Sequence, residues 1–429
     1  DAGAQDRSET DEALARSARF VDRPPTVTML AMPLLRRQIE RTCRSLAQHQ
    51  RWEDIVTITA AFGGRDEHVP SGLLMLRSRA LQRTRKVDEA RKILTDLAAN
   101  TAFLKRSSAY LLYELGEMLV TFDEFELALK MIQKGAPRIR MDFLSERLRQ
   151  VRTQQRLHTS YSTSEAAHFH LRYPPERAAT FAVGASRVLE AERTRLLKWV
   201  PGTSEKQVSV QLLWYDEFRR TYAGGADILG LFDGTVRVPL AGVAEFSPLV
   251  VSIMTHELAH AMIADVTDGR APHWFQEGLA QHVEMRRFRP NYITEYSAQH
   301  SLLSIPVVEG VLQSFSDAAL VEQAYQESEW VVAFIEARFG LPGIHRLLKS
   351  FRDGRQTEEA VKEALKLSIA ELDAAFIAWS LQQPKMVRDT IIAYDAHPDE
   401  SFKLSTPVKA EPGVKKEPLN VPDSLLFGN

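Results

Sequence analysis

Apolar and polar positions follow a helical period in the first part of the chain and a mixed period in the rest. Between Met32 and Leu157, apolar residues recur three and four positions apart, and the alternation typical of strands is almost absent. The pattern predicts helices in pairs, which are Leu34 to Gln48 with Trp52 to Phe62, Gly72 to Arg83 with Val87 to Ala98, and Ser107 to Leu119 with Glu124 to Lys134. We therefore expect this part to consist of helical hairpins.

The predicted hairpins recur at a nearly regular interval. Their second helices align at Ile55, Ala90 and Ala128, a period of roughly 35 to 38 residues, close to the roughly 34 residues of a tetratricopeptide repeat. The residues around Ala90 and Ala128 resemble the small-residue packing point of that repeat. We expect a tetratricopeptide-like helical-hairpin solenoid over residues 32–160. An ordinary helical bundle is the alternative.

After residue 160, strand-like segments alternate with helices. Gln207 to Leu213 is rich in strand-forming residues, and Gly230 to Leu240 has the pattern of a hairpin that turns at Asp233-Gly234. Pro175 to Val200 has the period of a long amphipathic helix. The fold class predicted for the chain is mainly α with a small mixed β-sheet, that is, α+β.

The apolar segment from Pro248 to Val266 contains an H-E-x-x-H motif, His256-Glu257-Leu258-Ala259-His260. In a helix the two histidines lie one turn apart on the same face, so both imidazoles can reach one metal ion. Two histidines and a glutamate inside a buried helix cost on the order of several kcal/mol when they lack a partner. A metal ion is such a partner.

A catalytic zinc ion needs a third protein ligand and keeps one position open. Glu277 meets this need, because it follows a turn at Gly269 to Pro272 and begins a second apolar segment, Trp274 to Val283, that predicts a returning helix. A surface carboxylate favoured by the helix dipole is the alternative. The sequence thus predicts a metal site made of His256, His260 and Glu277.

The string HELAHAM, followed by PHWFQEGLAQHVE, resembles the gluzincin metallopeptidases, the clan of thermolysin and aminopeptidase N. It is most similar to the peptidase MA-like domains of bacterial proteins that also carry tetratricopeptide-like repeats. The similarity is strongest from about Ser247 to Glu284 and weaker from about Ser164 to Trp379. The resemblance implies a thermolysin-like zincin domain over residues 161–395.

The resemblance also assigns roles to the four motif residues. It implies that His256, His260 and Glu277 bind Zn²⁺ and that Glu257 is the general base for a zinc-activated water. Members of the clan hold an extended substrate on an antiparallel edge strand beside the zinc helix, and we expect Thr235 to Leu240 to be that strand. The G-x-M-E-N motif that grips a free amino terminus is absent. An endopeptidase is therefore favoured over an exopeptidase.

A tyrosine or histidine stabilises the oxyanion in this clan. Tyr325 is our candidate, because the resembling domains often carry a similar A-Y-x-x-S segment that opens a helix after the zinc ligands. The alternative is a half-buried tyrosine that only packs. Tyr292 and Tyr296 are weaker candidates.

Composition and charge exclude some partners. The net charge of −2 argues against nucleic acid and anionic membranes as partners. No integral membrane segment is expected, because His256, Glu257, His260 and Asp265 interrupt the apolar run from Pro248. Cys43 is the single cysteine, so no disulfide can form within the chain.

The two ends of the chain differ from the middle. Residues 1–31 are expected to be an N-terminal segment disordered in part, and residues 396–429 a disordered tail rich in Pro, Lys and Glu. Asp1 stands in place of an initiator methionine, which we interpret as the result of signal-peptide removal. We expect a periplasmic or secreted protein, with the cytoplasm as the alternative.

Together these features predict a zinc-dependent endopeptidase. Its substrate is a peptide or protein, and the helical repeats recruit the substrate or a protein partner. The alternative is a catalytically silent, zinc-binding tetratricopeptide-like scaffold for protein–protein interaction.

Overall fold

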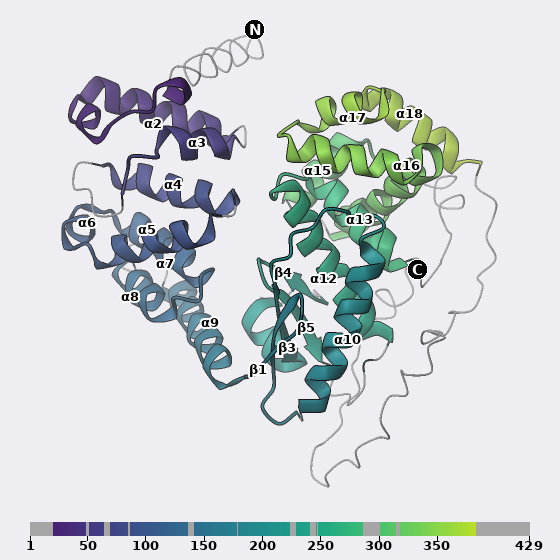
Figure 1. Ribbon diagram of the computed structural model, residues 1–429, viewed down its shortest axis with the longest axis horizontal. Helices are drawn as coiled ribbons and strands as arrows, with labels where there is room; N and C mark the ends of the chain where they lie inside the picture. The colour runs from purple at the N-terminus through teal and green to yellow at the C-terminus, as the bar shows by residue number, and fades with distance from the viewer. Residues whose placement is uncertain are drawn as a thin grey trace. The chain divides into compact units, whose positions relative to one another are not determined.

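The computed structural model describes residues 20–48, 51–63, 69–84, 86–135, 141–177, 179–223, 229–240, 246, 248–285, 301–314 and 318–382. These residues fall into two compact units, the first up to Thr159 together with Asp268–Arg270 and the second from Ser160 onward without that short segment. Each unit has its own buried apolar core. The described chain is mostly helical and contains one small mixed sheet (Figure 1), which agrees with the fold class predicted from the sequence.

The described part of the first unit consists of helices. They are η1 (Val27–Ala31), α2 (Pro33–Gln48), α3 (Trp52–Ile58), α4 (Ser71–Arg83), α5 (Val87–Ala99), α6 (Thr101–Arg106), α7 (Ala109–Val120), α8 (Phe125–Gly135) and α9 (Met141–Ser160). Successive helices pack on each other, α3 on α4, α4 on α5 and α7 on α8. The six helices predicted in pairs are present, whereas α6 and α9 were not predicted. The tetratricopeptide-like solenoid stays a prediction.

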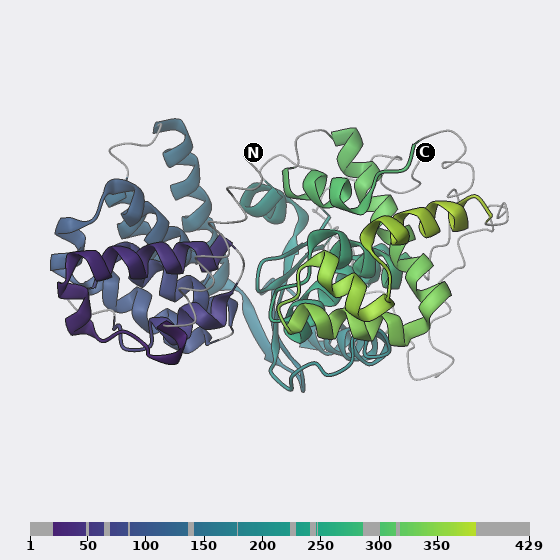
Figure 2. The ribbon, with the colours of Figure 1, turned by 90° about the horizontal axis from the view of Figure 1, so that it is seen from above.

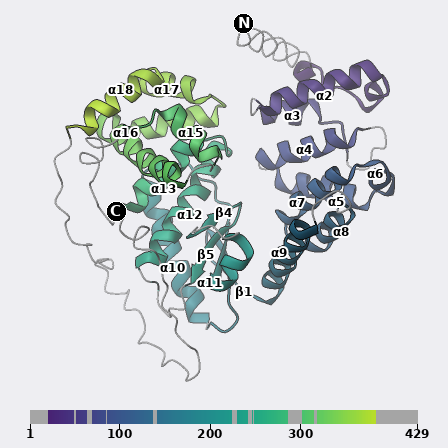
Figure 3. The same cartoon turned by 180° about the vertical axis from the view of Figure 1, so that it is seen from behind.

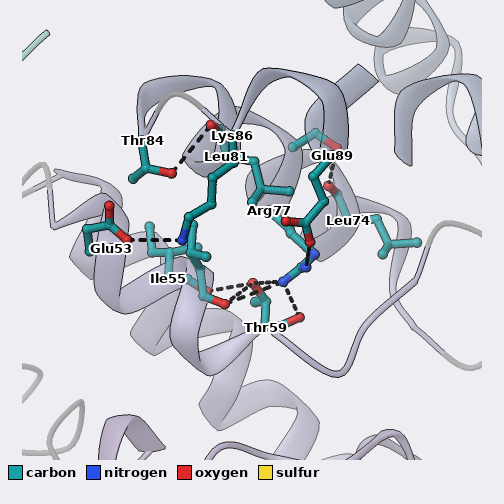
Figure 4. A network of polar contacts seen from close by, with 11 residues as sticks. Glu53, Ile55, Thr59, Leu74, Arg77, Leu81, Thr84, Lys86 and Glu89 are labelled. Atoms are coloured by element: carbon teal, nitrogen blue, oxygen red, sulfur yellow. Dashed lines mark hydrogen bonds and ion pairs between the residues drawn. The ribbon is translucent and has the colours of Figure 1, made fainter. Parts of the chain in front are cut away.

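A buried arginine joins three helices of the first unit (Figure 4). The guanidinium of Arg77, on α4, donates hydrogen bonds to the carbonyl oxygens of Thr59 at 2.5 Å and Val56 at 3.4 Å, at the end of α3. Its other amino group pairs with Glu89 on α5. Because the last carbonyls of a helix lack partners within the helix, Arg77 adds hydrogen bonds at the end of α3, where the Thr59 carbonyl also accepts one from the backbone N–H of Phe62.

The second unit contains a five-stranded sheet in the order β1-β2-β3-β5-β4. The strands are β1 (Ser162–Glu165), β2 (Phe169–Tyr173), β3 (Val208–Trp214), β4 (Leu231–Phe232) and β5 (Val236–Leu240). The pairs β2-β3 and β3-β5 are parallel, and the pairs β1-β2 and β5-β4 are antiparallel. The hairpin predicted around Asp233-Gly234 is present, but the prediction that Thr235 to Leu240 forms the edge is wrong, because β4 pairs on the outer side of β5.

Helices cover the sheet and extend beyond it. They are α10 (Ala179–Leu196), α11 (Tyr215–Phe218), the π-helix η3 (Arg219–Ala223), α12 (Pro248–Thr267), α13 (His273–Met285), α15 (Ile305–Ser314), α16 (Ala318–Arg352), α17 (Thr357–Leu365) and α18 (Ile369–Ser380). Helix α12 packs against α10, β4, β5 and α13, and α13 packs against α16 (Figure 3). Figure 2 shows the light green to yellow helices α16, α17 and α18 together in the second unit. The H-E-x-x-H motif, which lies on α12, is therefore in the centre of this unit.

The apolar character of α12 has a structural explanation. Residues Leu249–Thr267 are long and apolar enough to cross a membrane by length and composition, even though charged and polar motif residues interrupt the run. However, 72% of the apolar window is buried inside the protein. A helix enclosed by other elements is apolar on most sides for this reason alone.

Candidate metal centre

Helix α12 carries the two motif histidines on one face. Residues Met254, Leu258 and Ala259 are fully buried and fix the helix in the core. His256 and His260 lie one turn apart, and their Nε2 atoms are 3.0 Å from each other. The two Nε2 atoms are therefore close enough to bind the same metal ion.

Glu277 approaches these two atoms from α13. Asp268 and Gly269 adopt left-handed φ values of 52° and 67°, so the chain reverses after α12 and α13 returns along it. The Oε2 atom of Glu277 lies 3.6 Å from Nε2 of His256 and 3.4 Å from Nε2 of His260. The structure thus brings together the three side chains that the sequence predicted as ligands.

The spacing of the three ligand atoms fits zinc. Bonds of about 2.0–2.1 Å at tetrahedral angles place two ligand atoms about 3.3–3.4 Å apart. The observed separations of 3.0, 3.4 and 3.6 Å lie around this value. Two imidazoles and one carboxylate are also a donor set that Zn²⁺ favours, and they leave one tetrahedral position open.

Glu284 orients His256, a function that the sequence reasoning missed. Its Oε2 atom lies 2.9 Å from Nδ1 of His256, and its other oxygen accepts a hydrogen bond from Ser252. A carboxylate at Nδ1 holds the proton there and leaves the Nε2 lone pair for a metal. The available signal was the spacing of seven residues between Glu277 and Glu284, which places both on one face of a helix.

Glu257 follows His256 on α12 and lies at the edge of the sheet. Its side chain is buried, and a Cβ atom on Gly230 would stand 2.5 Å from its Oε1 atom. The backbone that enters β4 therefore passes directly against this carboxylate. Glycine is required at position 230 because any larger residue would displace either the strand or Glu257.

The charged groups shift one another's pKa. Burial lowers the pKa of His256, but hydrogen bonds to Glu277 and Glu284 outweigh burial and raise it well above its ordinary value. Burial raises the pKa of Glu277, but His260 and the hydrogen bonds from both histidines hold it below its usual range. Burial raises the pKa of Glu257 against the opposing charges of the histidines. A raised pKa suits a carboxylate that accepts and releases a proton near neutral pH.

Tyr325 lies on α16 within electrostatic reach of the site. Burial raises the pKa of its phenol first, and the charges of Glu277 and Glu257 raise it further. Its ring packs against the core of the second unit. The weaker candidates, Tyr292 and Tyr296, lie outside the described residues.

Comparison with known families bears on the same elements. Residues 244–382 match the Peptidase MA superfamily. The match begins just before α12, contains all three convergent side chains and ends after α18. It supports a zincin-like peptidase domain in this part of the chain. No curated protein sequence matches the chain.

Proposed function

We propose that the second unit is a zinc-dependent endopeptidase. The observation that carries the proposal is the convergence of His256, His260 and Glu277 at separations of 3.0 to 3.6 Å, with the buried carboxylate of Glu257 beside them. The superfamily match over residues 244–382 supports a peptidase. The three convergent residues would hold the metal, and Glu284 would keep His256 in the binding tautomer.

A bound zinc ion would act as a Lewis acid that polarises the scissile carbonyl and makes water acidic near neutral pH. Glu257 accepts the proton of the attacking water and delivers it to the leaving amine. Its burial favours this function, because a carboxylate in a dry environment binds a proton more readily. Tyr325 donates a hydrogen bond from its hydroxyl to the oxyanion that forms at the carbonyl.

The edge strand β4 offers a place for an extended peptide. Asp233 donates a backbone hydrogen bond to Thr235, and antiparallel pairs alternate between bonded and non-bonded positions, so the main-chain groups of Phe232 and Gly230 point away from β5. No other strand pairs with β4 among the described residues. A peptide added at this edge passes over Glu257, because Gly230 lies against that carboxylate.

The test compares two glutamate variants with the wild type. Glu257→Gln should retain one zinc per chain and lose hydrolysis of a denatured protein pool by about 10²-fold or more, because it removes proton transfer and no metal ligand. Glu277→Ala should lose zinc. Substoichiometric zinc in the wild type after zinc-replete purification would refute the metal site. Equal, negligible hydrolysis by wild type and Glu257→Gln with full zinc would favour the silent scaffold.

We also propose that the first unit recruits a protein substrate or partner. This unit has its own core, and none of the convergent site residues belongs to it, which supports a function separate from the chemistry. Removal of residues 1–159 should therefore leave zinc binding and short-peptide hydrolysis in place and reduce selection of the natural protein substrate. A truncated protein that is insoluble or free of zinc would contradict this division.

A further inference from the structure

His282 is a buried histidine that the proposed chemistry does not use. It lies on α13 and is only 7% exposed. Its Nδ1 atom lies 3.0 Å from Glu329, and its Nε2 atom lies 2.6 Å from Glu336, both on α16. Because each ring nitrogen faces a carboxylate, which accepts hydrogen bonds, both nitrogens donate and the ring is an imidazolium. A charged side chain thus ties α13 to α16 at two points.

The partners of His282 share a face of α16 with Tyr325. Glu329 follows Tyr325 by four residues and Glu336 follows it by eleven, so the three side chains form one stripe along the helix. The helix is regular over this stretch, since its non-helical residue is Gly340. Tyr325 is therefore one turn from the nearer contact of His282.

The backbones of α13 and α16 also approach each other closely, on the side of α13 that carries His282. Gly278 lies one turn before His282, and a Cβ atom at Gly278 would overlap the carbonyl of Ser328, which precedes Glu329. The neighbouring residue on α13 is Glu277, the third metal ligand. The segment of α13 from Glu277 to His282 thus links the proposed metal ligand to the turn of α16 that carries Tyr325.

We propose that His282 is a positioning residue for Tyr325. Its imidazolium holds α16 in register on α13 and so fixes the phenol of Tyr325 relative to Glu277. The inference rests on the proposed peptidase function. An error of about 1 Å in the position of a transition-state donor can reduce the rate by about 10²-fold, so the register of these two helices has a direct effect on turnover.

The decisive experiment is a double-mutant cycle between His282 and Tyr325 in the full-length zinc protein. His282→Gln keeps an amide donor but loses the charge. It should retain one zinc, lower kcat by about 10-fold or more and change KM by less than about 3-fold, because a donor that acts in the transition state is displaced. In the Tyr325→Phe background the same substitution should change kcat by less than about 3-fold. A double variant that loses the product of both factors would overturn the proposal, as would an unchanged kcat for His282→Gln.

His273→Gln is the matched control. His273 is at the start of the same helix and binds Glu309 of α15 at 3.0 Å, so the substitution removes a similar contact that does not involve α16. Its kcat should stay within about 2-fold of the wild type.

Amide hydrogen exchange tests the contact without reference to hydrolysis. Exchange in α16 between residues 318 and 339 should be faster in His282→Gln than in the wild type and unchanged in His273→Gln. If His282→Gln fails to fold, Glu329→Gln keeps an acceptor but removes the charge at one of the two contacts, and it should show the same effects in weaker form. A wild type without any hydrolysis would refute the peptidase proposal, and unchanged exchange in α16 would separately refute the positioning function of His282.

Discussion

Glu277 and Glu284 stand seven residues apart on α13 and approach opposite nitrogens of one imidazole. Glu277 lies 3.6 Å from Nε2 of His256, and Glu284 lies 2.9 Å from Nδ1 of the same ring. One face of a single helix thus carries both a proposed metal ligand and the group that would orient a second proposed ligand. The two functions can be separated by substitution.

Glu284→Gln should weaken zinc binding without abolishing it. The amide can still accept a hydrogen bond from Nδ1 of His256, but it makes the imidazole a poorer donor to the metal, and loss of such a partner costs about 10- to 100-fold in affinity. Competition with a chromogenic chelator measures the effect. Asp265→Asn is the control, because the Asp265 carboxylate, on the same helix as His256, binds Ser204. Equal affinities for Glu284→Gln and the wild type would contradict the orienting function.

Gly230→Ala should lower turnover and keep the metal. The new methyl group would stand 2.5 Å from Glu257 and 2.7 Å from Ile253, so the carboxylate or the edge strand must move. We expect kcat to fall by about 10-fold or more, with one zinc per chain. Gly310→Ala, on α15, meets nothing within 4 Å and is the control. A Gly230→Ala enzyme with normal kcat would show that the strand has room at this point.

Arg77→Met should destabilise the first unit. Arg77 is 4% exposed, and its loss removes the buried guanidinium that bonds the carbonyls of Val56 and Thr59 and pairs with Glu89, at a cost of about 1–3 kcal/mol. Arg79→Met removes an exposed pair with Glu114 and should cost less than about 0.5 kcal/mol. Hydrogen exchange in α3 to α5 reports the stability of this region. Similar effects of the two substitutions would argue against a structural function of the buried network.

Glu327→Gln should remove a pH dependence of stability in the second unit. Burial raises the pKa of Glu327 from 4.5 to about 7, although hydrogen bonds from Gln323 and the backbone of Leu303 oppose the shift. The folded state therefore holds this proton more tightly than the unfolded chain. Its stabilising contribution is complete below pH 4.5 and is lost as the pH rises through about 7.

Urea unfolding of wild type and Glu327→Gln across this range measures the difference. Near pH 8 the variant should unfold at a higher urea concentration than the wild type. This difference between the two urea concentrations should disappear near pH 4.5. Glu322→Gln, an exposed position on the same helix, is the control. A difference between Glu327→Gln and wild type that is independent of pH would contradict the assignment.

The elements that could be predicted from the sequence are those that a local pattern of residues encodes. The helix with His256 and His260, the reversal at Gly269 and the returning helix with Glu277 all follow from spacing within about thirty residues. The helical first unit and the hairpin at Asp233-Gly234 follow in the same way. These signals need no knowledge of which elements are neighbours in space.

The features that the sequence missed depend on distant partners. His282 is buried because Glu329 and Glu336 contact it from a helix 47 and 54 residues further along the chain. The edge position of β4 could not be predicted either. A hairpin has two strands, and which of them faces outward depends on whether β3 pairs with the first or the second.

The short strand β4 has a consequence for selectivity. Among the described residues, outward main-chain groups lie only at Phe232 of β4 and at Gly230 just before it, so a peptide bound there would be held by atoms that every amino acid shares. Main-chain hydrogen bonds of this kind recognise an extended conformation and do not depend on which side chains flank the scissile bond. We therefore expect broad tolerance of sequence in short unstructured peptides, with discrimination among whole proteins depending on whether they can present an unfolded stretch to this edge.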